Sequence, residues 1–371
     1  MGTLRTILAL SVVFAHTSHP FVFVGGRTAV QLFYMISGFL ISYVLTNTQS
    51  YNNVGVFWAN RALRLYPVYY FVALLTLAGY FLYPSRMGEF GQAPLLAKCI
   101  LAIVNVTIVG QDWVMFLSDH NGVLEFTGRF WESDVQLWHL LLVPQAWTLG
   151  IELSFYAVAP FIIRRPILLL LLFVLSIAGR AFAIYDGFGL EDPWTYRFFP
   201  FELALFILGI ASHQLLLKPA MALIAKLPQF PVDPFVYAGC AIACTVYFLV
   251  PLSEWVKLPA LIAIIFLSLP FLFLFQDKNA ADKWIGDLSY PLYIGHLFAM
   301  LIVAHFIGKY EYLSSLPLAI DLIKVFFCLI FAVILKIVIA DPVESIRRAV
   351  RNARKPPPET GLKGSQRNIQ C

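Results

Sequence analysis

The chain has 371 residues, of which 60% are hydrophobic and only 13% are charged, and its mean hydropathy is +0.78. A soluble domain cannot bury so much apolar surface, so the composition excludes one and indicates a polytopic membrane protein built from helices. The net charge is +5, and seven of the 26 basic residues follow Glu344. Clustering of this kind is typical of membrane orientation and not of nucleic-acid binding.

The first apolar stretch, residues 4–20, contains two basic groups at an informative spacing, Arg5 and His16. Eleven residues turn an α-helix by about 1100°, within about 20° of three whole turns, so both side chains lie on one face about 16 Å apart. We expect Arg5 at one membrane surface and His16 deep in the bilayer, where an ionisable group is costly and indicates function. No small-residue cleavage site follows, so we expect this span to be retained.

Ten further stretches are long enough to be considered as membrane spans. They cover residues 29–46, 62–83, 92–111, 136–163, 167–185, 198–217, 234–251, 258–276, 284–306 and 317–340. Basic residues flank several of them, namely Arg61, Arg64, Arg164, Arg165, Lys218, Lys226, Lys278 and Lys283. The positive-inside rule makes these loops cytoplasmic.

If both termini are cytoplasmic, the number of spans is even, and we predict ten. We expect the odd stretch within residues 92–146, as a re-entrant or interfacial segment. The alternative is that 92–111 spans fully and the count changes elsewhere. The predicted organisation is a membrane domain over 1–340 and a basic, disordered cytoplasmic tail over 341–371, where Pro356, Pro357 and Pro358 occur.

The five cysteines have no CxxC spacing, and we expect neither a disulfide framework nor a metal site. In the second apolar stretch, Ser37 and Gly38 interrupt a bulky face, which permits close approach of another helix. Arg61 and Arg64 are three residues apart and share a helical face. They either anchor the cytoplasmic boundary or bind an anionic ligand, because guanidinium groups match phosphate oxygens.

Two more ionisable residues fall inside apolar stretches, Glu152 and His296. Glu152 has Tyr156 one turn further along the same face. A buried glutamate needs a partner or a raised pKa, so Glu152 is either a functional carboxylate or half of a structural ion pair. Judged by itself, His296 is more simply interpreted as a structural histidine.

Together these segments resemble the acyltransferase 3 family of integral membrane acyltransferases over residues 3 to 340. The similar segments are Arg5-x10-His16; Ala29–Tyr34 through Ser37-Gly38-Phe39-Leu40; Arg61-x-x-Arg64 before Tyr66-Pro67; Trp147-Thr148-Leu149-x-x-Glu152-x-x-Phe155-Tyr156; and Ser289-Tyr290-x-x-Tyr293-x-x-His296. Thr148 replaces the family's serine. Gln31 stands where many relatives carry an acid, and the chain looks like the form without a soluble hydrolase-like extension.

The resemblance implies transfer of an acyl group, most often acetyl, from acyl-CoA to a sugar hydroxyl of a surface polysaccharide or its lipid-linked precursor. It implies an enzyme of the bacterial cytoplasmic (inner) membrane whose partners are lipid, acyl-CoA as donor substrate and a glycan acceptor. No bound cofactor, metal or nucleic acid is expected.

Residue roles follow from the chemistry. A neutral histidine can take the hydroxyl proton, so His16 is the candidate base, oriented by Glu152. Arg5, Arg61 and Arg64 are the candidate acyl-CoA-binding residues. Ser37, Tyr156 and His296 are further candidates, and Ser37 would serve as a covalent relay if transfer is not direct. The competing hypotheses are a transporter that uses the same buried charges, and a membrane assembly subunit without catalysis.

Overall fold

The computed structural model describes residues 1–82, 84–227, 230–307 and 316–352. The helices are α1 (Gly2–Ala15), α2 (Gly25–Asn47), α3 (Val54–Leu82), α4 (Pro84–Gln92), α5 (Leu95–Thr107), α6 (Trp147–Ile162), α7 (Pro166–Tyr185), α8 (Trp194–Arg197), α9 (Phe199–Ala211), α10 (Leu217–Lys226), α11 (Val232–Thr245), α12 (Glu254–Lys278), α13 (Ala280–Asp287), α14 (Ser289–Ile307), α16 (Pro317–Leu335) and α17 (Asp341–Asn352). One antiparallel hairpin joins β1 (Leu117–His120) and β2 (Val123–Phe126).

The prediction of an all-α membrane fold is confirmed, since helices dominate and seven stretches of the described chain are long and apolar enough to cross a bilayer. These stretches are Gly25–Asn47, Val54–Tyr80, Pro166–Tyr185, Phe199–Lys226, Glu254–Lys278, Ala280–Phe306 and Pro317–Asn352. Helices α1, α5 and α11 are apolar but shorter. The count of ten spans therefore stays a prediction.

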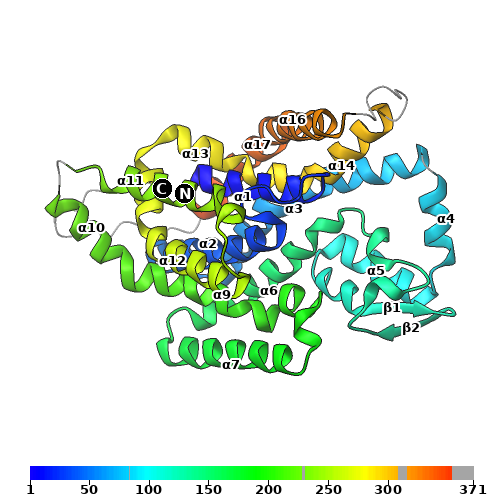
Figure 1. Cartoon of the computed structure of the whole chain (residues 1–371), viewed down its shortest axis with the longest axis horizontal. Coiled ribbons are helices and arrows are strands. Elements are labelled where there is room, and N and C mark those ends of the chain that lie inside the picture. The colour runs from blue at the N-terminus through cyan, green and yellow to red at the C-terminus, as the bar shows by residue number, and fades with distance from the viewer. Residues whose placement is uncertain (83, 228–229, 308–315, 353–371) are drawn as a thin grey trace.

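The segment between α5 and α6 differs from an apolar span. Residues 136–146, which hydropathy assigns to one stretch with α6, form short 3-10 turns, and α6 begins only at Trp147. Prolines and polar residues explain this, because Pro144 cannot continue a helix formed by the residues before it. With α4, α5 and the hairpin, this segment lies at one end of the molecule, opposite α10 (Figure 1).

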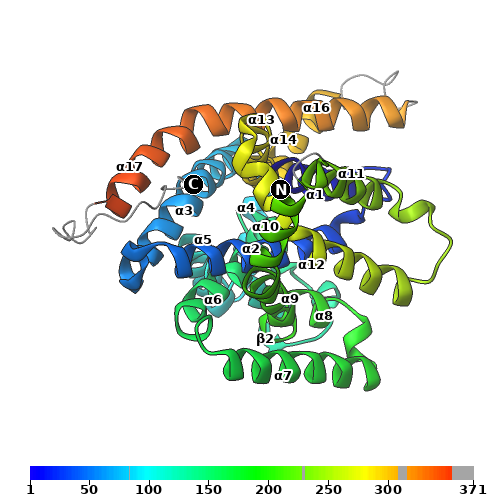
Figure 2. The same cartoon turned by 90° about the vertical axis from the view of Figure 1, so that its left-hand side faces the viewer.

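The C-terminal segment also differs from the prediction in part. Residues 341–352 form α17, which continues α16 through a π-helical turn at Lys336–Ala340. Several contacts hold this segment, among them the bond of the Lys336 ammonium to Asp341 at 2.8 Å and the bond from the Asn60 amide of α3 to the Arg347 carbonyl at 3.2 Å. Figure 2 shows α17 beside α3. The rest of the predicted tail, 353–371, lies outside the described residues.

Helix α2 runs through the centre and crosses α9 at two glycines, Gly38 and Gly209. A Cβ on Gly38 would lie 2.0 Å from the backbone oxygen of Phe206, and one on Gly209 would lie 1.9 Å from that of Met35. The close approach predicted at Ser37-Gly38 is confirmed. Backbone contact of this kind maximises packing where lipid provides no hydrophobic driving force between helices.

Several helix ends with arginines meet at one end of the molecule. Arg164, after α6, donates to the Leu45 carbonyl of α2 at 2.9 Å and to Asn52 at 2.8 Å. The contact of Asn60 with Arg347 brings the start of α3 and helix α17 to each other. Asn60 thus links the segments that carry Arg61 and Arg347, while Arg164 is bonded to the end of α2 and to the turn that follows it.

Candidate active site

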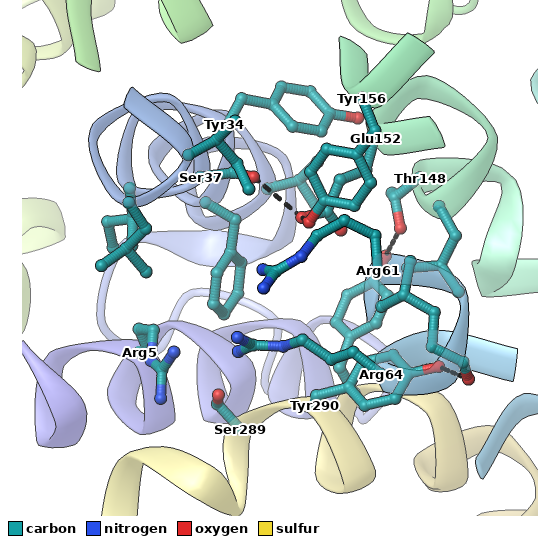
Figure 3. A pocket seen from close by; sticks show the side chains of 18 residues that line it. Arg5, Tyr34, Ser37, Arg61, Arg64, Thr148, Glu152, Tyr156, Ser289 and Tyr290 are labelled. Atoms are coloured by element: carbon teal, nitrogen blue, oxygen red, sulfur yellow. Dashed lines mark hydrogen bonds between the residues drawn. The ribbon is translucent and has the colours of Figure 1, made fainter. Parts of the chain in front are cut away.

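An open cavity, with about 800 Å³ of empty space when the solvent at its mouth is included, lies between α1, α2, α3, α6 and α14. Three arginines line it, Arg5 from α1 and Arg61 and Arg64 from α3, and Figure 3 shows the last two extending toward Arg5. Glu152 is the only acid among the described residues that line it. The cavity therefore carries an excess of positive charge inside a largely apolar helix bundle.

Arg5 and Arg61 are buried, Arg64 is partly exposed, and all three guanidinium groups are incompletely paired among the described residues. Arg5 and Arg61 are 7% and 6% exposed, and the Nε atom of each has no hydrogen-bond partner among the described residues. Arg5 makes a 3.8 Å contact with Asp287, while Arg61 donates to the Asn60 Oδ1 at 2.9 Å. Arg64 makes no hydrogen bond or ion pair within the described chain. Buried guanidinium groups with free donors indicate a site for an anion.

The absence of a side chain at Gly286 makes room for Arg5 beside the other cavity arginines. A Cβ on Gly286 would lie 2.4 Å from the Cα of Gly2 and 2.8 Å from an Nη atom of Arg5. Helix α1 can therefore approach α13 only where a side chain is missing. Gly286 lies three residues before Ser289, which lines the cavity together with Tyr290.

Glu152 forms a second group in the cavity, with Ser37 and Tyr156. The Ser37 hydroxyl donates to Glu152 Oε1 at 2.8 Å, and the Tyr156 hydroxyl donates to the same oxygen (Figure 3). We predicted that Glu152 orients His16, but the hydrogen bonds join Glu152 to Ser37 and Tyr156 instead. The reason is geometric, since Glu152 and Tyr156 lie one turn apart on α6 and face α2, while His16 ends α1.

His16 lies at the end of its helix and not deep within it. Helix α1 ends at Ala15, His16 is the C-cap residue, and its side chain is exposed. Helix α1 has 14 residues, about 21 Å at 1.5 Å per residue, so it does not extend over the full predicted stretch 4–20, and the depth of His16 in a bilayer stays a prediction. His16 also does not line the arginine cavity.

His296 is the partner of His16. Their ring centroids are 5.2 Å apart, and His296 is fully buried. The His296 Nδ1 lies 2.7 Å from the carbonyl oxygen of Tyr293, so Nδ1 carries the proton and Nε2, which has no partner, is an acceptor. The sequence offered no means of pairing two histidines 280 positions apart.

Tyr293 connects the cavity to the histidine pair. Its side chain lines the cavity and its hydroxyl is 3.0 Å from the Thr148 Oγ1, while its backbone carbonyl contacts His296. The cavity wall is therefore one helical turn from the histidines.

Two residues near these groups escaped the sequence reasoning, Arg197 and Asp112. Arg197 forms a bidentate pair with Asp192 at 2.7 and 2.8 Å, stacks 4.2 Å from the Trp147 ring, and is close enough for its charge to act on His16. Asp112 is 2% exposed, and burial raises the pKa of its carboxyl to about 7. A Cβ on Gly150 would lie 2.5 Å from the Asp112 Oδ1, so the missing side chain at Gly150 makes room for this carboxylate. Neither belongs to a motif that a single sequence reveals.

The structure thus separates the predicted site residues into two groups. Arg5, Ser37, Arg61, Arg64, Glu152 and Tyr156 line the cavity, whereas His16 and His296 form a pair beyond Tyr293. Their chemical roles stay predictions. Among the described residues, no group of three or more His, Cys, Asp or Glu side chains has the arrangement of a metal site.

Comparisons with known proteins identify the family of the chain. A family model described as an acyltransferase domain matches residues 2–341. The chain is also 27% identical over 303 residues to the exopolysaccharide production protein ExoZ of Rhizobium meliloti (strain 1021). The aligned region covers 78% of this chain and 80% of that protein. No solved structure gives a significant match. The chain therefore belongs to the acyltransferase 3 family and is an enzyme that transfers acyl groups.

Proposed function

We propose that the chain is a membrane O-acyltransferase that moves an acyl group, acetyl as the first candidate, from acyl-CoA to a hydroxyl of a cell-surface polysaccharide or its lipid-linked precursor. One observation carries the proposal: three arginines line a cavity that Tyr293 also lines, and Tyr293 is one turn from a histidine pair. The name of the relative ExoZ, an exopolysaccharide production protein, supports a polysaccharide acceptor.

The donor would enter at the arginines. Coenzyme A is elongated, with phosphates at one end and the thioester at the other. Arg5, Arg61 and Arg64 supply charge-assisted donors for the phosphates, which suits them better than lysines would. The arm that carries the thioester would then extend along the apolar wall toward Tyr293 and Thr148.

His16 would act as the general base. An acceptor hydroxyl gives its proton to the imidazole as its oxygen attacks the thioester carbonyl. The C–S bond then breaks, and the imidazolium returns the proton to the CoA thiolate. The exposure of His16 supports this role, because a glycan can reach the ring. Transfer is direct in this scheme, and Glu152 balances the arginines and holds Ser37 and Tyr156.

The proposed topology has ten spans, with both termini cytoplasmic and the arginine end of the cavity facing the cytoplasm, where acyl-CoA is found. The basic helix ends that carry Arg61, Arg164 and Arg347 support this orientation under the positive-inside rule. The bacterial inner membrane is the proposed location.

The proposal is tested with labelled acetyl-CoA and membranes that contain the chain, followed by counting label in the glycan and lipid fractions. Wild-type membranes should incorporate label, and Arg64→Gln membranes should need a higher acetyl-CoA concentration to do so. Substrate movement across vesicles without any acylation, repeated with longer acyl-CoAs, would instead support the transporter hypothesis.

A further inference from the structure

A second hollow of about 440 Å³ adjoins the arginine cavity and shares Arg61 with it. Its walls come from Tyr43 and Tyr51, from Asn60 and Arg61 of α3, and from α17. The family match ends at residue 341, where α17 begins, so the residues that α17 contributes lie outside it.

The centre of this hollow is one amide oxygen that two guanidinium groups share. The Asn60 Oδ1 accepts from Arg61 Nη2 at 2.9 Å and from Arg347 Nη2 at 3.1 Å, and the Asn60 amide returns a bond to the Arg347 carbonyl at 3.2 Å. Asn60 is only 2% exposed. A neutral oxygen thus holds two positive groups beside each other, which fixes their positions without cancelling their charge.

The charges in the hollow are unbalanced. Arg61, Arg347, Arg348 and Arg351 line it, and Glu344 is the only acid among its described lining residues. Glu344 pairs with Arg347 and, at 3.5 Å, with Arg348. Within the part of the chain that the structure describes, the Nε atoms of Arg61 and Arg347 are both buried without a partner. Free, buried donors on crowded guanidinium groups point to an anion with several oxygens.

We propose that this hollow binds the phosphorylated nucleotide end of the acyl-CoA donor, with Arg347 as a phosphate ligand beside Arg61. The pantetheine arm then passes Arg61 into the larger cavity. The rings of Tyr43 and Tyr51 on the wall give the adenine base a surface to pack against. This inference rests on the proposed function, and it makes α17, which sequence reasoning treated as tail, part of the donor site.

An anionic lipid headgroup offers the same phosphate chemistry, so the experiment has to separate the two sources. The full chain is purified in nanodiscs of neutral lipid, and binding of CoA, 3′-dephospho-CoA and pantetheine is measured for wild type and Arg347→Gln. Arg165→Gln is the matched control, because Arg165 is an exposed arginine after α6 that lines neither cavity. Thermal midpoints of all variants report folding.

We expect Arg347→Gln to weaken CoA binding by about tenfold or more, which corresponds to ~1.4 kcal/mol. Pantetheine binding should not change, and the control should match wild type. Wild type itself should bind 3′-dephospho-CoA more weakly than CoA. This comparison needs no substitution, so it can be made even if Arg347→Gln does not fold. Equal losses for CoA and pantetheine, or no preference of wild type for CoA, would overturn the inference.

Two further measurements distinguish a failure of this inference from a failure of the proposed function. Adding phosphatidylglycerol to the nanodiscs should not compete with CoA, and competition that Arg347→Gln abolishes would assign the hollow to lipid instead. If wild type transfers acetyl from acetyl-CoA but Arg347→Gln has the same KM, this inference alone is wrong. If wild type transfers no acyl group from any acyl-CoA, the proposed function fails.

Discussion

The Ser37 hydroxyl donates a 2.8 Å hydrogen bond to Glu152, joining α2 to α6 at the wall of the arginine cavity. The same carboxylate oxygen accepts from Tyr156. A carboxylate held by two hydroxyls among three arginines balances charge in this cavity. It is therefore not the group that orients His16, whose neighbour is His296.

This arrangement predicts that Ser37→Ala keeps acetyl transfer within about tenfold of wild type, because the change removes one hydrogen bond of the order of 1 kcal/mol. Initial rates with labelled acetyl-CoA give the measurement. A covalent relay predicts the opposite: loss of activity in the variant, and a burst of label on wild-type protein in the absence of acceptor.

Arg64→Gln should raise the KM for acetyl-CoA by about tenfold to a hundredfold, since hydrogen bonds to charged groups contribute about 1.5–3 kcal/mol. The thermal midpoint should not fall, because Arg64 makes no hydrogen bond or ion pair among the described residues. Arg165→Gln removes the same charge from an exposed position and should leave KM unchanged. A lower kcat at unchanged KM would argue against phosphate binding by Arg64.

Stability should fall as the pH rises toward neutrality, because burial raises the pKa of Asp112 from 3.8 to about 7. The folded chain binds this proton more tightly than the unfolded chain does. The resulting stabilisation is complete below pH 4 and is lost as the pH rises through 7, with an upper value of ~4 kcal/mol. Asp112→Asn should therefore raise the thermal midpoint at pH 8 more than at pH 5. Asp186→Asn, at an exposed position, is the control, and an equal gain at both pH values would contradict the account.

Gly38→Val should destabilise the fold by about 3 kcal/mol or more, because overpacking a helix crossing forces the backbones apart. The added Cβ would lie 2.0 Å from the Phe206 oxygen. Gly79→Ala provides a matched control, since a Cβ on Gly79 meets nothing within 4 Å. Thermal midpoints in detergent should separate the two variants, and equal midpoints would show that α2 and α9 do not cross as described.

The sequence predicts the helical membrane class and most of the cavity, for a physical reason. Apolar stretches of bilayer length must form helices, and motifs with fixed helical spacing, such as Arg61 with Arg64 or Glu152 with Tyr156, keep their shared faces. Periodicity says nothing about which helices pack together, so the sequence could not predict the partners of His16 and Glu152. The same limit explains Arg347, whose partner Asn60 is 287 positions away.

The most direct test of the account compares His16→Ala with wild type for transfer of labelled acetyl from acetyl-CoA to the glycan fraction, at matched expression. His120→Ala, a histidine at the end of β1, is the control. The account predicts that His16→Ala lowers transfer by about a hundredfold or more, as loss of a general base does, while the control keeps wild-type activity. Transfer by His16→Ala within a few-fold of wild type would contradict it.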